Sequence, residues 1–391
     1  MKITDVKIFI MDAFRTNWSF IKVETDEGLY GWGEASLGTR EYSVAGCVED
    51  LKRLIVGRNP LEIEKMWYEV YRDSYWKGGP VMMTAMSGIE IAMWDIMGKY
   101  FDVPVYTFFG GKIRNEVKMY ANGWFVGAKE PEDFAAAASK AVSKGVKALK
   151  WDPFGSSYMN ITNEQMEKTV RIVGAVREAA GPYTDLLIEG HGRFYPTAAI
   201  QICRELEPFK PMFFEEPCLP DDIDSTAMVR AKSNIPIAAG ERIYTKFGFA
   251  ELFAKKAVDI VQPDVFHTGG LYECKKIAAM AEANRIFVSY HNASGPISNA
   301  AILHLASTIP NFLIHEIMLT DGSFRKAITN EEVEFRDGYI KIPDKPGFGI
   351  EVNEEEVMKR PYKPRNLRHY NGTLTDIRAK DDTVYYFKGL E

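Results

Sequence analysis

The 391-residue chain lacks several features that would place it in a class at once. Its four cysteines are far apart and form no C-x-x-C pair, so neither a disulfide framework nor a cysteine metal site is expected. The net charge of -6 leaves no excess of basic residues for nucleic-acid binding. The N-terminal stretch MKITDVKIFIMDAF has too short an apolar run for a signal peptide or a membrane span. We therefore expect a cytoplasmic protein that contacts neither nucleic acid nor a membrane.

The length of the chain predicts two domains, or one large barrel with an accessory domain. Residues 1–118 begin with two strand patterns, KITDVKIFIM and SFIKVETDEGLYGWGEA, and Asp26-Glu27-Gly28 fits the turn of a hairpin within the second. The stretch MMTAMSGIEIAMWDIMGKYF then has apolar residues at helical spacing. This first segment is predicted to be an α+β domain.

Residues 119–320 follow a different sequence pattern, in which short apolar strands alternate with helical segments. The predicted strands are VKMYANGW, VKALKWD, LLIEGH, PMFFEEP, IPIAAGE, DIVQPDV, IFVSYH and FLIHEI. Eight such units within about 200 residues favour an α/β fold with a parallel (β/α) barrel. Residues 321–391 return to turns and short strands, and we expect them to pack back on the first segment.

Ionisable residues stand at the ends of seven successive predicted strands. They are Lys150 with Asp152, Glu189 with His191, Glu215, Glu241, Asp264, His291 and Glu316. From Glu189 onward the intervals are 23 to 27 residues, about one β/α unit each. Because barrel enzymes build their sites from the C-terminal ends of several strands, these side chains are expected to meet at one mouth. Any one of them alone would more simply be a helix cap or a satisfied core group.

The stretch LLIEGHGRF ends a buried strand with an acid and an imidazole. Side chains alternate along a strand, so Glu189 and His191 are predicted to point the same way, roughly 7 Å apart. The stretch FFEEP offers both Glu215 and Glu216, of which only one can point inward, and spacing does not decide which.

Three carboxylates on consecutive strands would repel one another in a barrel mouth. We expect Glu189, Glu215 and Glu241 to hold a hard divalent cation. With neither cysteine nor histidine among the three, Mg²⁺ or Mn²⁺ is favoured over Zn²⁺.

Several segments together resemble the enolase superfamily, in its mandelate-racemase-like branch of acid-sugar dehydratases. They are SGIEIAMWDIMGKYFDVPVYTFFGG, VKALKWD, IEGHGR, FFEEP, GER, DIVQPDVFHTGG, YHN, HEI and DGYIKIPDKPGFGIEV. The resemblance implies an α+β capping domain, formed by the N-terminal segment and the C-terminal tail, on a modified TIM barrel, (β/α)7β. It also implies one Mg²⁺ at the barrel mouth and abstraction of a proton α to a substrate carboxylate. The family pattern favours Glu215 as ligand, while Glu189 replaces the aspartate that is common at the first ligand position.

The resemblance also assigns expected roles to the other strand-end residues. Members of this superfamily use a lysine or histidine base together with Mg²⁺. His291 is expected to be the base, oriented by Asp264, although Asp264 alone could be a helix N-cap. Lys150 is expected to donate to the substrate carboxylate, and Glu316, if protonated, to hydrogen-bond the enediolate.

Two positions separate the reactions of the family. Racemases of this branch carry a second lysine where this chain has Asp152, which we expect to contact the substrate instead. Acid-sugar dehydratases have a histidine two residues after the first ligand, as His191 is here, and an imidazolium there can protonate a departing 3-hydroxyl. The predicted reaction is dehydration of an aldonate such as gluconate or galactonate to a 2-keto-3-deoxy acid, six carbons being favoured by the tail RHYNGTLTDIR. A racemase or epimerase, a metal-dependent hydrolase and a non-catalytic barrel protein are the alternatives.

The stretch FRTNWSF near the N-terminus has two open interpretations. Arg15 and Trp18 would touch the distal hydroxyls of a substrate if this turn closed over the barrel, or would pack on their own sheet. The remaining four histidines are expected to be structural: His267, His304, His315 and His369. We also expect a homo-oligomer, between a dimer and an octamer.

Overall fold

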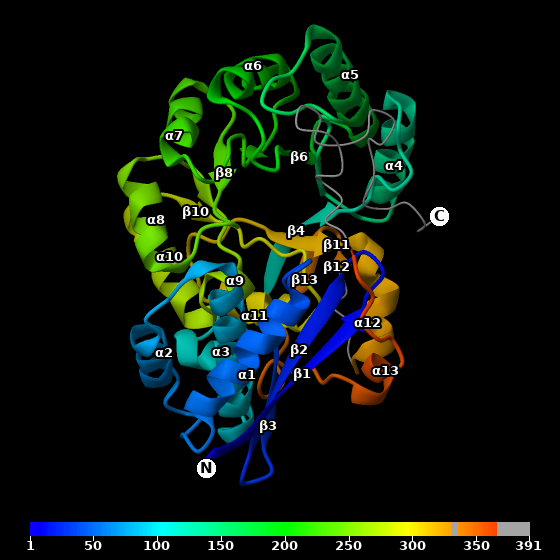
Figure 1. Ribbon diagram of the computed structural model, residues 1–391. Coiled ribbons are helices and arrows are strands. Elements are labelled where there is room, and N and C mark those ends of the chain that lie inside the picture. Colours follow the sequence, from blue (N-terminus) through cyan, green and yellow to red (C-terminus); the bar gives the residue numbers. More distant parts are fainter. Residues whose placement is uncertain (331–334, 366–391) are drawn as a thin grey trace.

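A three-stranded antiparallel sheet and three helices form the N-terminal part of the computed structural model, which describes residues 1–330 and 335–365 (Figure 1). The strands are β1 (Ile3–Asp12), β2 (Asn17–Thr25) and β3 (Tyr30–Glu34), and the helices are α1 (Glu41–Ile55), α2 (Ile63–Asp73) and α3 (Gly79–Tyr100). The turn predicted at Asp26-Glu27-Gly28 joins β2 to β3, with Gly28 at a φ of +79°. A left-handed φ of this kind is readily adopted by glycine.

Helix α3 packs directly on β3. A Cβ atom at Gly31 would lie 2.0 Å from the carbonyl oxygen of Ala92, and one at Gly33 would lie 1.9 Å from that of Gly88. The glycines of the stretch YGWGE therefore allow this close approach of helix to strand. Although α3 has 22 residues, no helix in the described part of the chain combines the length and apolarity needed to cross a bilayer.

Eight parallel strands form the barrel. They are β4 (Glu116–Asn122), β5 (Ala148–Trp151), β6 (Asp185–Glu189), β7 (Phe213–Glu215), β8 (Ile237–Ala239), β9 (Ile260–Val261), β10 (Phe287–Val288) and β11 (His315–Met318). Each strand from β4 to β9 pairs with the next one, and β11 pairs with β4. Strand β10 is joined to the segment before β11 by an isolated bridge between Val288 and Phe312. The predicted barrel is confirmed.

Helices follow the first seven barrel strands on the outside (Figure 1). They are α4 (Pro131–Ser143), α5 (Asn163–Ala180), α6 (Pro196–Leu206), α7 (Ile223–Lys232), α8 (Thr245–Ala254), the pair α9 (Val265–Thr268) and α10 (Leu271–Ala283), and α11 (Pro296–Ala306). Helix α11 leads into the eighth strand, β11, so the order within the described residues is (β/α)7β, as predicted.

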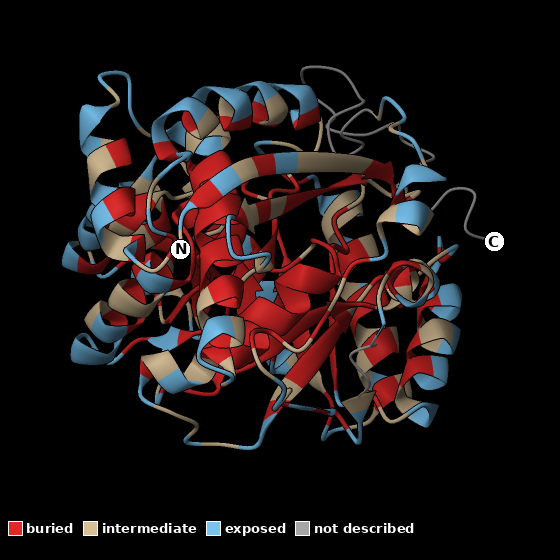
Figure 2. Cartoon of the chain, turned by 90° about the horizontal axis from the view of Figure 1, so that it is seen from below, coloured by how far each residue is buried: buried red, intermediate tan, exposed pale blue. Residues whose placement is uncertain are grey.

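The barrel interior is filled by one apolar layer. The layer consists of Tyr120, Ala148, Leu187, Phe213, Ala238, Ile260 and Ile314. Since side chains alternate along a strand, the residue two positions further on points into the same interior, nearer the C-terminal end of the barrel. This rule brings polar residues from β5, β6, β7 and β11 above the apolar layer. Figure 2 shows the buried residues concentrated at the centre, with exposed ones on the outer helices.

Two buried acids of the N-terminal part bind the N-termini of barrel helices. Glu34 accepts hydrogen bonds from the backbone N–H groups of Gly295 (2.6 Å) and Ser298 (3.1 Å) at α11. Glu90 accepts from Leu271 (2.9 Å) and Tyr272 (3.0 Å) at α10. Carboxylates suit the positive end of a helix dipole and its unpaired N–H groups. The N-terminal part is therefore attached where the loops after β9 and β10 leave the barrel.

The described C-terminal segment contacts both parts of the molecule. It contains α12 (Gly322–Ile328), β12 (Phe335–Arg336), β13 (Tyr339–Lys341) and α13 (Glu354–Met358). Strand β13 pairs antiparallel with barrel strand β4, whereas Glu354 of α13 forms an ion pair with Lys22 of β2 at 2.6 Å. The tail RHYNGTLTDIR and His369 lie outside the described residues. The domain boundaries expected at residues 118 and 320 stay predictions.

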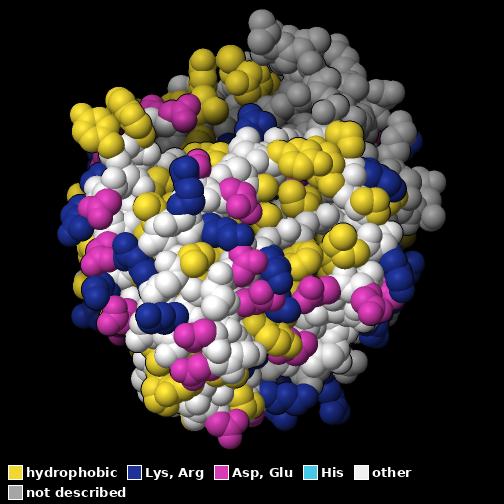
Figure 3. Space-filling view, turned by 60° about the horizontal axis from the view of Figure 1, so that its bottom comes forward, with side chains coloured by type: hydrophobic (Ala, Val, Ile, Leu, Met, Phe, Trp, Pro, Cys, Tyr) yellow, Lys and Arg dark blue, Asp and Glu magenta, His cyan; other side chains and the backbone are white. Residues whose placement is uncertain are grey.

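Charged side chains of both signs are interspersed on the face drawn in Figure 3. This face has no extended area of one sign, in keeping with the mixed composition of the sequence.

Candidate active site

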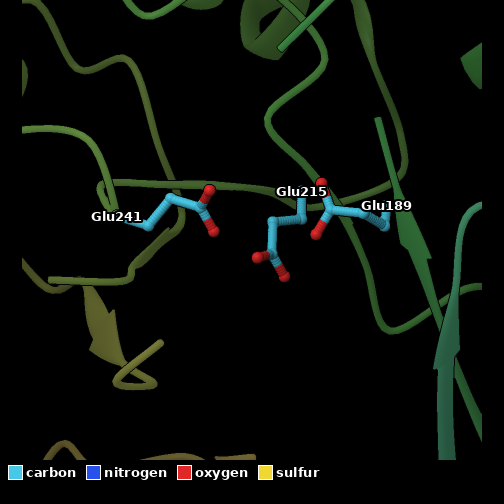
Figure 4. Close-up of side chains that lie close together, drawn as sticks. All are labelled: Glu189, Glu215 and Glu241. Atoms are coloured by element: carbon cyan, nitrogen blue, oxygen red, sulfur yellow. The ribbon is translucent and has the colours of Figure 1, made fainter. Parts of the chain in front are cut away.

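Three carboxylates meet at the C-terminal end of the barrel. Glu189 is the last residue of β6, Glu215 the last of β7, and Glu241 lies two residues beyond β8. One oxygen from each lies within 4.8 Å of the others, and Figure 4 shows the three side chains reaching toward a common space. The structure thus brings together the three residues that the sequence analysis grouped.

Glu215 and Glu216 point to opposite sides of β7. Glu215 shares the inner face with Phe213 of the apolar layer and is fully buried. Glu216 has a φ of +40°, and its carboxylate forms an ion pair with Arg242 at 2.5 Å. Burial, together with the charge of Glu241, raises the pKa of Glu216 to about 8. Strand alternation thus places Glu215 inside the barrel with the other two acids, whereas the left-handed turn after β7 directs Glu216 to Arg242.

Lys150 lies among these acids on the inner face of β5. Its ammonium group lies 2.6 Å from Glu215, 3.1 Å from Glu189 and 3.4 Å from Glu316, and only 2% of the side chain is exposed. Burial alone would lower the pKa of Lys150, but the surrounding carboxylates, Glu215 foremost, raise it well above its ordinary value. Lys150 is therefore a permanent cation at the base of the site, where it contacts the acids themselves.

The three acids do not respond alike to their surroundings: burial alone would raise the pKa of Glu241, but the charges of His291 and Arg242 outweigh burial and lower the pKa to about 2. Burial raises the pKa of Glu189 well above its ordinary value, and the nearby Glu215 adds to this effect. A bound cation would favour the ionised form of the same group. Three oxygen donors with no sulfur or imidazole donor among them fit a hard divalent ion such as Mg²⁺ or Mn²⁺.

His291 and Asp264 form a hydrogen-bonded pair beside Glu241. Nδ1 of His291 lies 2.7 Å from Oδ2 of Asp264, while Nε2 lies 3.3 Å from Oε2 of Glu241. Burial alone would lower the pKa of His291, but the carboxylates of Glu241 and Asp264 raise it well above the ordinary value. Asp264 is also the N-cap of α9, accepting from the N–H of Phe266 at 2.8 Å. The N-cap interpretation of Asp264 is confirmed, and its contact with His291 is present, while the role of His291 as base stays a prediction.

His191 and Asp152 form a second pair of the same kind. Nδ1 of His191 lies 2.8 Å from Oδ2 of Asp152, and Oδ1 of Asp152 accepts from Arg193 at 2.5 Å. Strand β6 ends at Glu189, and His191 has a φ of +52°, so the alternation rule that we applied to Glu189 and His191 does not hold past the strand end. The turn instead directs the imidazole toward the neighbouring strand β5.

Glu316 is fully buried on the inner face of β11. It accepts from the side chain of Asn122 at 3.1 Å and from the backbone N–H of Asn292 at 2.9 Å. Burial alone would raise its pKa, but Lys150 and His291 lower the pKa of Glu316 to about 2. A protonated Glu316, the condition for the hydrogen-bond donor that we expected, is therefore disfavoured in this arrangement.

Arg15 and Trp18 hold the N-terminal part against the barrel. Arg15 donates to the carbonyl oxygen of Ala293 (2.6 Å) and forms an ion pair with Asp321 (2.9 Å). Trp18 belongs to β2, is fully buried and packs edge-on against Phe20. A side chain that water cannot reach touches no substrate unless the surrounding structure moves. Trp18 thus packs on its own sheet, whereas Arg15 binds residues outside that sheet, and substrate contact by either residue stays a prediction.

Two residues that the sequence analysis missed also belong to the site. Gln262 donates to Oε2 of Glu215 at 2.8 Å, and Arg193 binds Asp152. Gln262 stands two residues after Ile260 of the apolar layer, so strand alternation from that position would have found it. No local pattern identifies Arg193, whose partner lies 41 residues away in the sequence.

The remaining described histidines lie apart from the three acids. His304 is buried in α11, accepts from the N–H of Tyr106 at 3.3 Å, and burial lowers its pKa to about 4. His315 is fully buried, and burial lowers its pKa to about 3. His267 contacts Thr84 of α3 at 2.9 Å and lies 3.5 Å from Asp264, so it borders the site.

A closed (β/α)7β barrel with acids, a lysine and two histidines at one mouth, beneath a second α+β part, defines a barrel enzyme with a candidate metal centre. The family models support this class. Residues 133–357 match the model described as "Enolase C-terminal domain-like", and residues 5–110 match "Mandelate racemase / muconate lactonizing enzyme, N-terminal domain". The chain belongs to the enolase superfamily.

Individual relatives cover almost the whole chain. A D-galactonate dehydratase of Pectobacterium atrosepticum is 36% identical over 368 residues, which are 92% of this chain and 94% of the relative. A D-gluconate dehydratase of Thermoproteus tenax is 35% identical over 371 residues, 94% of this chain and 73% of the relative. A crystal structure of an enolase superfamily member from Salmonella Typhimurium matches with a TM-score of 0.88 and 34% identity, covering 92% of this chain and 98% of that one.

Proposed function

We propose that this protein is a Mg²⁺-dependent dehydratase of sugar acids, acting on a six-carbon aldonate such as gluconate or galactonate. The observation that carries the proposal is the meeting of three carboxylates with two separate Asp-His pairs at one barrel mouth. The similarity to D-galactonate and D-gluconate dehydratases supports the same reaction type. The product would be a 2-keto-3-deoxy acid.

Glu189, Glu215 and Glu241 would hold the cation. When bound, Mg²⁺ supplies Lewis-acid stabilisation of the negative charge that develops on the substrate carboxylate. Lys150 contributes a permanent positive charge beside the carboxylate oxygens of Glu189 and Glu215. Because Glu241 lies 3.3 Å from His291, the charge state of the three acids and the proton affinity of His291 are linked.

His291 would remove the α-proton through Nε2, since its Nδ1 is held by Asp264. The resulting enediolate loses its 3-hydroxyl only if that oxygen takes up a proton as it departs. His191 is the second imidazole at the mouth and would supply this proton. The enol that remains tautomerises to the 2-keto acid.

Racemisation is the second candidate, and the environment of Asp152 argues against it. Two-base racemisation needs a base on each face of the substrate carbon. Both oxygens of Asp152 already accept hydrogen bonds, one from Arg193 and one from His191. Asp152 is therefore poorly placed to accept a substrate proton. A zinc-type hydrolase is disfavoured because the three grouped acids include no histidine.

The test is incubation of the purified protein with Mg²⁺ and a panel of aldonic and aldaric acids, followed by a colour assay for 2-keto-3-deoxy acids. We expect product with at least one six-carbon aldonate and none from the His291→Asn variant prepared in the same way. Absence of product with every acid would contradict the dehydratase proposal. The homo-oligomer expected above stays a prediction, which sedimentation of the same preparation would measure.

A further inference from the structure

The mouth of the barrel contains the same construction twice. Asp264 follows β9 and holds Nδ1 of His291, which follows the neighbouring strand β10. Asp152 follows β5 and holds Nδ1 of His191, which follows the neighbouring strand β6. In each case an aspartate at one strand end holds a histidine at the end of the next strand.

The two pairs also share their local bonding. Oδ1 of Asp264 accepts the backbone N–H two residues ahead, at Phe266 (2.8 Å), and Oδ1 of Asp152 accepts that of Phe154 (3.0 Å). The second oxygen of each aspartate is thereby left for the imidazole. Fixing an aspartate by its own backbone orients its second oxygen toward the imidazole before any ligand arrives.

The two pairs lie on opposite sides of the barrel. The strand order runs from β4 through β10, and β11 closes the barrel against β4. In a ring of eight strands, β5 is four steps from β9, and β6 is four steps from β10. A substrate held at the centre would therefore have one Asp-His pair on each side.

Arg193 distinguishes the second pair from the first. Its side chain is fully buried, its guanidinium donates to Oδ1 of Asp152 at 2.5 Å and to the carbonyl oxygen of Gly155 at 3.3 Å, and it lies over the rings of Phe154 and Phe194. A buried arginine keeps its partner carboxylate ionised and limits its movement. The side chain of Asp152 is only 4% exposed, whereas that of His191 is 21% exposed. The aspartate is thus an internal support, and the imidazole is the part that reaches the mouth.

The backbone between Glu189 and Arg193 is shaped for this contact. The N–H of His191 donates to Oε1 of Glu189 at 2.7 Å, and that of Gly192 donates to the carbonyl oxygen of Glu216 at 2.8 Å. A Cβ at Gly192 would lie 1.9 Å from a guanidinium nitrogen of Arg242. The turn therefore holds His191 in a left-handed conformation that is uncommon for a non-glycine residue.

We propose that Asp152, fixed by Arg193, is a positioning residue that holds Nδ1 of His191 and so presents Nε2 as the proton donor to the leaving hydroxyl. This inference rests on the proposed dehydratase function and deepens it. Asp152 does not act on the substrate directly. Asp152 orients the leaving-group acid, whereas Asp264 orients the base. The two aspartates therefore affect different steps of one reaction.

The test compares three measurements on the Asp152→Asn variant, using whichever aldonate of the panel the unaltered protein dehydrates. They are formation of the 2-keto-3-deoxy acid, exchange of the α-hydrogen with deuterated solvent, and release of fluoride from the 3-deoxy-3-fluoro analogue. Fluoride departs with much less help from a proton donor than hydroxide does. We expect dehydration to fall by about 10²- to 10⁴-fold, the range for loss of a general acid, with exchange and fluoride release within about threefold of the unaltered protein.

Asp264→Asn is the matched control, because it removes the equivalent aspartate from the base. It should reduce all three measurements, since each requires removal of the α-proton. The double variant Asp152→Asn/His191→Asn should dehydrate no more slowly than His191→Asn alone, because one aspartate acting through one histidine gives non-additive effects. Loss of all three activities in Asp152→Asn, or of none, would overturn the proposal, as would additive losses in the double variant.

The Asp152→Asn variant leaves Arg193 buried without its carboxylate partner, which costs stability. A separate measurement therefore uses the unaltered protein and does not depend on how well the variant folds. Nitrogen-15 NMR of histidine-labelled unaltered protein, with the His191 signal assigned by its absence in His191→Asn, reports which ring nitrogen carries the proton in neutral imidazole. We expect the Nδ1-protonated tautomer, and the opposite tautomer would overturn the proposal. If the unaltered protein dehydrates no aldonate, the proposed function fails, whereas the tautomer of His191 can still be measured.

Discussion

Glu215 and Glu216 are adjacent in the sequence, but their carboxylates bind different side chains. Glu215 lies with Lys150, Gln262 and the other two acids inside the barrel, while Glu216 lies against Arg242. The reason is that Glu215 is the last residue of β7 and lies on its inner face, whereas Glu216 has a left-handed backbone just beyond the strand end. A conservative substitution at the two positions therefore tests the assignment of the metal ligands.

Glu215→Gln should weaken binding of Mg²⁺ or Mn²⁺ by about tenfold or more, which corresponds to about 1.4 kcal/mol, because it removes one anionic donor. Glu216→Gln should change the affinity much less. Isothermal titration calorimetry with each metal alone measures both, and no catalytic activity is required. A larger effect at Glu216 than at Glu215 would contradict the ligand assignment.

His291 and His191 should fail at different steps when replaced. His291→Asn should stop both dehydration and exchange of the α-hydrogen in deuterium oxide, because removal of that proton begins both processes. His191→Asn should slow dehydration by about 10²- to 10⁴-fold while recovered substrate gains deuterium at carbon 2. Mass spectrometry of recovered substrate checks the result. Exchange in the first variant but not in the second would mean that the two roles are reversed.

At the scale of elements, helix N-termini of the barrel are held by acids of the N-terminal part. Glu34 at the end of β3 binds the start of α11, and Glu90 in α3 binds the start of α10. Burial is the largest influence on both carboxyls and raises the pKa of each to about 7. The hydroxyl of Ser36 donates to Oε1 of Glu34 at 2.6 Å and opposes the rise of the Glu34 pKa only in part.

These raised pKa values predict how stability depends on pH. A carboxyl whose pKa is about 7 in the folded protein, against an ordinary value of 4.5, keeps its proton to a higher pH in the folded state than in the unfolded state. Its contribution to stability is complete below about pH 4.5 and is lost as the pH rises to about 7. The shift corresponds to on the order of 3 kcal/mol. Glu34→Gln should reduce the difference in the free energy of unfolding between pH 5 and pH 8 by that order.

Denaturant unfolding at the two pH values measures this difference. Glu164→Gln, at an exposed position in α5, is the control and should leave the difference unchanged. A difference in Glu34→Gln equal to that of the unaltered protein would show that Glu34 is ionised in the folded state across this range.

At the scale of the whole molecule, a cation bound at the mouth would couple the site to the stability of the fold. The acids at the mouth come from β6 and β7 and from the loop after β8, so a bound cation links three consecutive barrel units. A ligand that binds only the folded state stabilises it by about 2.7 kcal/mol at 100 times its Kd. Mg²⁺ or Mn²⁺ at that concentration should therefore raise the melting temperature, and EDTA should reverse the rise.

Differential scanning fluorimetry with the metal and without substrate measures the shift. Glu241→Gln at the same metal concentration should show a smaller rise, since it lacks one donor. An equal rise in this variant and in the unaltered protein would place the stabilising metal elsewhere.

Much of this architecture was available from the sequence because it depends on local periodicity. Alternating apolar strands and helices predicted the barrel, and the spacing of strand-end residues predicted which side chains would gather at its mouth. Alternation within β7 limited the choice to Glu215 or Glu216. These properties follow from the two-residue repeat of a strand and the position of each strand end, both of which are written in neighbouring residues.

Tertiary structure decided the partners of the site residues. Three features of the site depend on residues that are distant in the sequence. They are the carboxylate that contacts His191, the contact of Lys150 with Glu215, and the burial of Trp18. The left-handed turn at His191 ended the alternation that the sequence had predicted for it. Local periodicity determines the face on which a side chain lies, but pairing across strands depends on how the whole barrel closes, and that closure brought Asp152 to His191 and Arg193.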